Sequence, residues 1–139
     1  MPEGRIEATQ KAFNIELKQF GTDNNIEVAL ENIDQQTDTS KPFLIGTMLQ
    51  APIEQADLGF TERMQGIYQV DINYQSHIGS TEINRMADAL NQAFKVGSTL
   101  TRGDICVTIT QFGLAPKIVD GGWFKTPISI NWITHTARL

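Results

Sequence analysis

The segment from Tyr68 to Gln75 constrains the fold more than any other, because its side chains alternate strictly between apolar and polar. The apolar members, which would share one face of a strand, are Tyr68, Val70, Ile72 and Tyr74. The polar members, which would share the other face, are Gln69, Asp71, Asn73 and Gln75. A period of two is typical of a β-strand with one buried face and does not fit a helix. We therefore expect a sheet whose polar face is either solvated or packed against another copy of the chain.

Two further segments have the spacing of amphipathic helices. Over residues 3–20 the apolar stripe consists of Ile6, Phe13, Leu17 and Phe20. Gly21 follows this stripe, where a helix is expected to end. The second helix is expected to begin at a capping Ser80 or Thr81 and to end before Gly97. Its apolar stripe consists of Ile83, Met86, Ala87, Leu90 and Phe94.

Alternating apolar runs predict four more strands, at residues 26–31, 42–50, 105–110 and 124–132. Pro127 cannot donate to a ladder, so its strand is expected to lie at an edge or to carry a bulge. Residues 52–62 are expected to form a long loop, and loops of this kind are often functional arms. Two helices are too few to cover both faces of such a sheet. We predict one α+β domain over residues 1–139, a two-layer sandwich of about five mostly antiparallel strands with two helices packed on one face.

The composition excludes several classes of protein. A formal net charge of −5 argues against sequence-independent binding of nucleic acid, because the surface repels phosphate on average. The single cysteine, Cys106, precludes an intrachain disulfide, and its place in an apolar run predicts a buried, inert thiol. The chain begins without the cationic and apolar pattern of a secretory signal, and no apolar run approaches the ~18 residues that span a bilayer. We therefore expect a cytosolic product, or a particle component made in a cytosol, with no membrane contact.

No pattern typical of catalysis stands out in the sequence. His77 and His135 have no cysteine or carboxylate at metal-ligand spacing. Gly121 and Gly122 precede a strand, so they offer no helix N-terminus to hold an anion. Asp71 is a candidate hydrogen-bond acceptor at an interface, because a general base would need a partner that the sequence does not offer. We expect a protein that is not an enzyme, without catalytic, cofactor-binding or metal-binding residues and without a cofactor.

Three stretches carry a more specific signal than the alternation between them. They are Pro42-Phe43-Leu44-Ile45, Arg63-Met64-Gln65-Gly66-Ile67-Tyr68-Gln69-Val70-Asp71-Ile72, and Asp120-Gly121-Gly122-Trp123-Phe124 followed by Pro127-Ile128-Ser129-Ile130. On these stretches the chain resembles the tail-terminator-like proteins of long-tailed bacteriophages and prophages. The resemblance covers roughly residues 42–133, and the second predicted helix and the strand after it come in the family's order.

The resemblance implies a structural virion protein. Members of such families form a ring, usually of six copies, on the last ring of the tail tube. They stop tube polymerisation and present a surface to head-completion or connector proteins. The protein would be assembled in the bacterial host cytoplasm and reside in the virion tail. DNA would pass through the ring without specific binding, because an acidic lumen repels phosphate.

A ring requires two different patches on each subunit, because only head-to-tail contacts close into a circle. Candidates for contact with a neighbouring copy or with the tube are Gln50, Ile53, Glu54, Asp57, Phe60, Arg63, Gln69, Asp71 and Trp123. Residues 50–62 are expected to form an arm because of their length between two strands. Trp123 either fills the core or anchors a contact, since tryptophan is favoured at interfaces.

Two alternatives remain open on the sequence. The first is another virion part of similar fold, such as a head–tail joining protein or a tail-tube subunit. The second is a small enzyme or ligand-binding domain, which a deep pocket holding a carboxylate of perturbed pKa would favour.

Overall fold

The computed structural model describes residues 4–30, 42–51, 54–55, 61–75, 80–103, 105–120 and 122–137. In chain order the elements are α1 (Arg5–Asp23), β1 (Glu27–Leu30), β2 (Phe43–Gln50), β3 (Glu54–Gln55), β4 (Thr61–Gln75), α2 (Ser80–Ala93), β5 (Thr99–Arg102), β6 (Ile105–Leu114), β7 (Ile118–Asp120) and β8 (Trp123–Ala137). The strands form one sheet in the order β1-β2-β4-β8-β6-β5, with β3 beside β4 and β7 beside β8. β1 and β2 run parallel, and the other described pairs are antiparallel.

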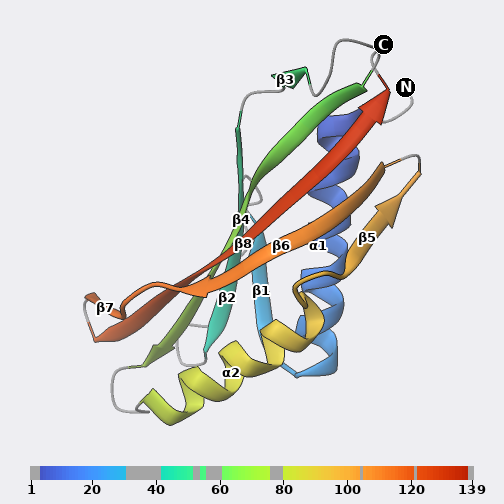
Figure 1. Cartoon of the computed structure of the whole chain (residues 1–139). Coiled ribbons are helices and arrows are strands. Elements are labelled where there is room, and N and C mark those ends of the chain that lie inside the picture. Colours follow the sequence, from blue (N-terminus) through green and yellow to red (C-terminus); the bar gives the residue numbers. More distant parts are fainter. Residues whose placement is uncertain are drawn as a thin grey trace.

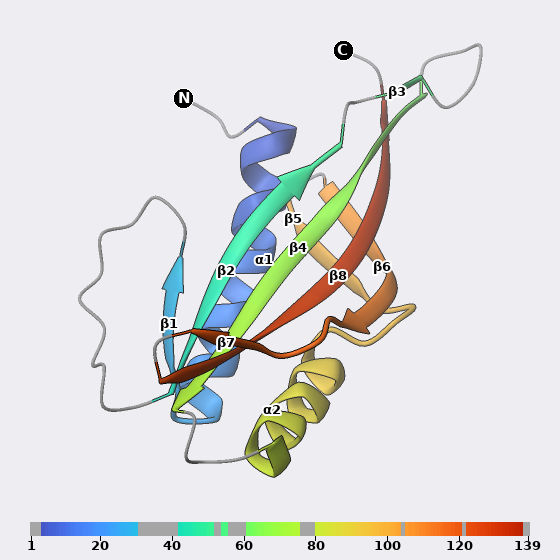
Figure 2. The ribbon, with the colours of Figure 1, turned by 90° about the vertical axis from the view of Figure 1, so that its left-hand side faces the viewer.

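The sheet curls around α1 instead of lying flat (Figure 1). Figure 2 shows α1 behind β2 and β4, with α2 beneath the strands. Both helices contribute side chains to one core on the concave face of the sheet. The predicted α+β class with two helices is therefore confirmed, whereas a two-layer sandwich of about five strands is wrong. Strands of this length carry a right-handed twist that accumulates along them, which turns the sheet into half of a barrel.

Three strands were not predicted because each is too short to carry a clear periodic signal. β3 and β7 are two and three residues long. β5 has no fully buried side chain, and it is a strand because Leu100 pairs with Val107 of β6. Backbone pairing with a longer neighbour, not a local apolar pattern, therefore makes these segments strands.

The longest element pair is β4 with β8, each of 15 residues. Their register runs from Thr61 opposite Ala137 to Gln75 opposite Trp123. The loop predicted over residues 52–62 is therefore partly wrong: β3 pairs with the start of β4, and β4 already begins at Thr61.

β8, which contains Pro127, has neighbouring strands on both sides, so the prediction of an edge strand is wrong. The bulge offered as the alternative is not at Pro127 either, because the register shift lies between Ile109 and Gln111 of β6. β6 and β7 both pair with the side of β8 that faces away from β4. The last β6 pair joins Leu114 to Ile128, and the first β7 pair joins Ile118 to Lys125. The oxygen of Pro127 accepts a hydrogen bond from the nitrogen of Ala115 at 2.9 Å, between these two pairs. Because the nitrogen and oxygen of one strand residue point the same way, the missing N–H faces the interruption between β6 and β7.

The centre of the core is a cluster of aromatic rings between the helices and the sheet. The ring of Phe13 on α1 stacks on Tyr68 of β4, with ring centroids 4.9 Å apart. Phe94 and Trp132 lie on either side, each with its centroid 6.1 Å from that of Phe13. The hydroxyl of Tyr68 donates to Oδ1 of Asn14 at 2.7 Å, so the polar end of the buried ring is paired. The alternating strand predicted from Tyr68 onward thus supplies the sheet side of the core.

Gly21 does not end α1, contrary to prediction. It is buried inside the helix, and an added Cβ would lie 2.5 Å from Cγ2 of Val28 and 2.8 Å from the oxygen of Ile26. The glycine therefore allows β1 to approach the helix, and Asn25 takes the left-handed conformation after it, with φ of 54°. Ile6 is 54% exposed and does not belong to the buried stripe, which corrects a second detail of this helix.

No helix among the described residues is long and apolar enough to cross a membrane.

Gly66→Ala tests the close packing within the β4–β8 ladder, where Gly66 lies opposite Trp132. An added Cβ would lie 2.6 Å from the oxygen of Leu49 and 2.9 Å from Cζ2 of Trp132. We expect the free energy of unfolding, measured by urea denaturation, to fall by about 2–4 kcal/mol. Gly113→Ala is the control, because no atom lies within 4 Å of its added Cβ. Equal effects of the two substitutions would contradict this account.

Candidate protein-docking surfaces

The convex face of the sheet, which the helices leave open, carries the polar side chains of β4. Asp71 is nevertheless only 6% exposed. Its Oδ2 lies 3.5 Å from Nζ of Lys125, and its Oδ1 accepts a hydrogen bond from Nε2 of Gln69 at 2.9 Å. Asn73 is also buried and donates to the main-chain oxygen of Asp71 at 3.2 Å. A solvated polar face is therefore wrong for Asp71 and Asn73, because they form a closed polar network with their neighbours.

Trp123 and Phe43 meet over β4 beside this network. Phe43 lies opposite Asn73 on β2, and Trp123 lies opposite Gln75 on β8. Their ring centroids are 5.4 Å apart at an interplanar angle of 67°, an edge-to-face contact. Trp123 is half-buried on the convex side and does not belong to the core cluster, so core filling is contradicted for this residue. The tryptophan of the core is Trp132, which is 1% exposed.

The middle of the convex face has no charged side chain in three successive cross-strand rows. These rows are Thr47-Gln69-Ser129-Gly113, Leu49-Ile67-Asn131-Gln111 and Gln65-Ile133-Thr108. Leu49 is 49% exposed at the end of β2. Depletion of charged side chains is typical of the centre of a protein interface, where desolvation of charges would be costly. We call these three rows the uncharged face.

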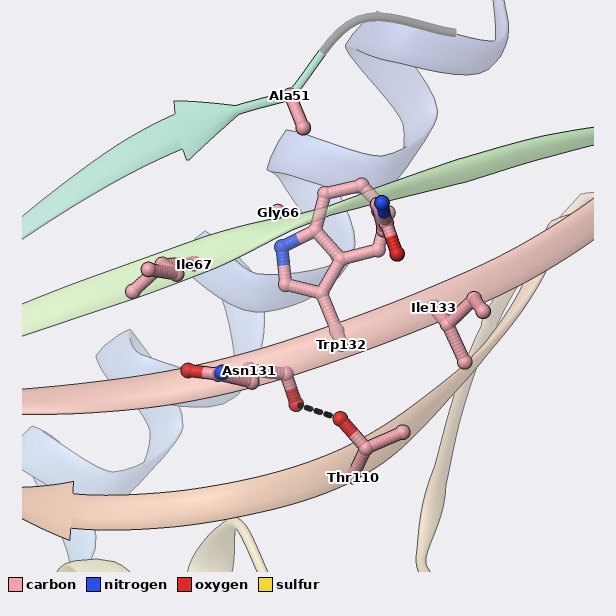
Figure 3. A pocket seen from close by; sticks show the side chains of 8 residues that line it. Ala51, Gly66, Ile67, Thr110, Asn131, Trp132 and Ile133 are labelled. Carbon is pink, nitrogen blue, oxygen red and sulfur yellow. Dashed lines mark hydrogen bonds between the residues drawn. The ribbon is translucent and has the colours of Figure 1, made fainter. Parts of the chain in front are cut away.

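A depression of about 260 Å³ overlaps the uncharged face, with which it shares Gln65, Ile67, Asn131 and Ile133 (Figure 3). Its lining residues are Ala51, Gln65, Gly66, Ile67, Thr110, Asn131, Trp132 and Ile133. Thr110, where the register of β6 shifts, donates to the main-chain oxygen of Asn131 at 3.3 Å. The buried Nε1 of Trp132 has no hydrogen-bond partner among the described residues. Small-molecule sites usually exceed about 300 Å³ and enclose their ligand. The depression therefore suits a protruding side chain better than a metabolite.

The contact residues predicted from the sequence do not form one site. Gln50, Glu54 and Arg63 gather at one end of the sheet, where Arg63 lies opposite both Glu54 of β3 and His135 of β8. Gln69 and Asp71 lie nearer the other end, within the polar network described above. Ile53, Asp57 and Phe60 of the predicted set, and His77, lie outside the described residues.

Sequence reasoning missed an apolar surface formed by β7 and the end of β6. Leu114, Ile118 and Val119 are 51%, 50% and 67% exposed. Lys117 places its Nζ 4.0 Å from the ring centroid of Phe124, so a cation covers the neighbouring aromatic ring. The adjacent pair Ile118 and Val119, which breaks the apolar–polar alternation, was the signal that could have identified this surface.

A shallow groove lies between α1 and β1. Its volume is about 320 Å³, and its lining residues are Asn14, Ile15, Lys18, Gln19, Thr22 and Leu30. Ile15 is 54% exposed, whereas Leu30 belongs to the edge of the core. One wall is therefore a helix and the other a terminal strand of the sheet. We call this the α1/β1 groove.

The described titratable groups do not assemble into a reactive centre. Among them, no three histidine, cysteine or acidic side chains lie close enough to hold a metal ion. Burial, and secondarily the charge of Glu82, raises the pKa of the Tyr74 hydroxyl above its ordinary value, away from the range in which it could act as a base at neutral pH. Cys106 is exposed, so the predicted buried thiol is wrong. It alternates with the inward Ile105 and Val107 of β6 and therefore points away from the core.

Comparison with known proteins gives a family and a fold. A family model described as phage tail terminator protein matches residues 8–132. A solved structure, of a protein that carries only a sequence identifier as its name, aligns over 95% of this chain and 96% of that chain with a TM-score of 0.78 and 18% identity. At that identity the similarity supports the fold alone. No curated protein matches the chain.

Alanine substitution of each tryptophan should show which ring lies in the core and which lies on the convex side, by the size of the loss in the free energy of unfolding. Trp123→Ala removes a half-buried ring, so we expect the free energy of unfolding to fall by about 1–2 kcal/mol. Trp132→Ala empties the centre of the core and should lower it by about 3–5 kcal/mol. Urea denaturation of both variants measures the difference, and a larger loss for Trp123→Ala would refute the placement of the two rings.

Proposed function

This chain belongs to the phage tail terminator family, and on that premise we propose that it caps the end of the tail tube as a ring of its own copies. Family membership makes it a structural protein of the phage tail that associates with other tail components. The ring would stop polymerisation of the tube protein and present its opposite side to a head-completion or connector protein. We further propose six copies in the ring and assembly in the host cytoplasm before incorporation into the virion.

The observation that carries this proposal is the uncharged face of the sheet. A chain with a formal net charge of −5 leaves three cross-strand rows of amides, hydroxyls and aliphatic side chains without a charge. Such a surface loses little when water is removed, whereas a surface that only kept the chain in solution would gain from charges. It therefore supports a function in binding other proteins over a broad area.

We propose that residues 50–62 form the arm that contacts a neighbouring subunit or the tube. Glu54 and Arg63 lie opposite each other where β3 pairs with the start of β4, and Gln50 ends β2 nearby, opposite Gly66; β3 lies at one end of the sheet (Figure 1). Trp123 is proposed as a second contact at the opposite end, because a half-buried tryptophan supplies a large apolar area at the surface. Gln69 and Asp71 act in this proposal by holding the strands together beneath the contact.

The acidic charge supports passage of DNA through the ring. Six copies carry about −30 formal charges in total, which repel the phosphate backbone over roughly a Debye length of 8–10 Å. DNA would then slide through the lumen without specific binding.

The proposal is tested by adding the purified chain to tail tubes that are growing from purified tube protein. We expect elongation to stop and tube lengths, measured by electron microscopy, to become fixed at the time of addition. A tail-tube subunit of similar fold would lengthen the tubes instead. A head–tail joining protein would bind to already capped tails without changing tube length.

Deleting residues 56–60 tests the arm within this assay. We expect the variant to keep its thermal unfolding midpoint within a few degrees, because it retains every core residue that the structure describes, and to lose tube capping. Replacing the same five residues by glycine and serine controls for length, and it should also fail if the side chains make the contact. Normal capping by the deletion variant would show that the arm is dispensable.

A further inference from the structure

We draw no further inference here: the strongest candidate, the depression on the convex face where the buried Nε1 of Trp132 lacks a hydrogen-bond partner among the described residues, carries nothing, because that nitrogen is too deeply buried for a ligand to reach and nothing in the structure shows what fills the depression or what covers β7 and the α1/β1 groove.

Discussion

Fifteen consecutive residue pairs join β4 to β8, and the remainder of the molecule is built on this ladder. β2 adds to one side of it and β6 with β7 to the other. Its register is fixed by the alternation in β4, because a slip of one residue would move every buried side chain to the convex face. Gly66 allows the indole of Trp132 to lie against the strand, which places the largest ring of the core over the ladder.

The helices pack only on the concave face of this ladder, and that asymmetry leaves the convex face without a covering helix among the described residues. The polar side chains of β4 on this uncovered face are accommodated in two different ways. Near one end, Asp71 and Asn73 are withdrawn into a network that Lys125 completes. In the middle, uncharged amides, hydroxyls and aliphatic side chains remain at the surface. Charges that would be costly to desolvate are thus absent from the part of the face that is most open to a partner.

A structural role in a phage tail requires surfaces of several kinds on a small chain. The uncharged face, the exposed apolar side chains of β7 and the α1/β1 groove lie on different parts of the molecule. Each is modest in extent, which suits contacts that become strong only when many copies assemble together on a template. Because the apolar residues are distributed in this way, they do not form one large contiguous hydrophobic patch on the described surface of the isolated chain.

The sequence by itself determined the elements whose signal is local: the alternating strand from Tyr68, the stripe of α2, the α+β class and the family. Tertiary structure decided the features that depend on distant partners. Backbone pairing made strands of β3, β5 and β7, the approach of Val28 explained Gly21, and the gap between β6 and β7 accommodated Pro127. It also buried Asp71 and exposed Cys106. Periodicity reports which face of an element is apolar, but only the folded chain decides which neighbour covers each face and which face stays open.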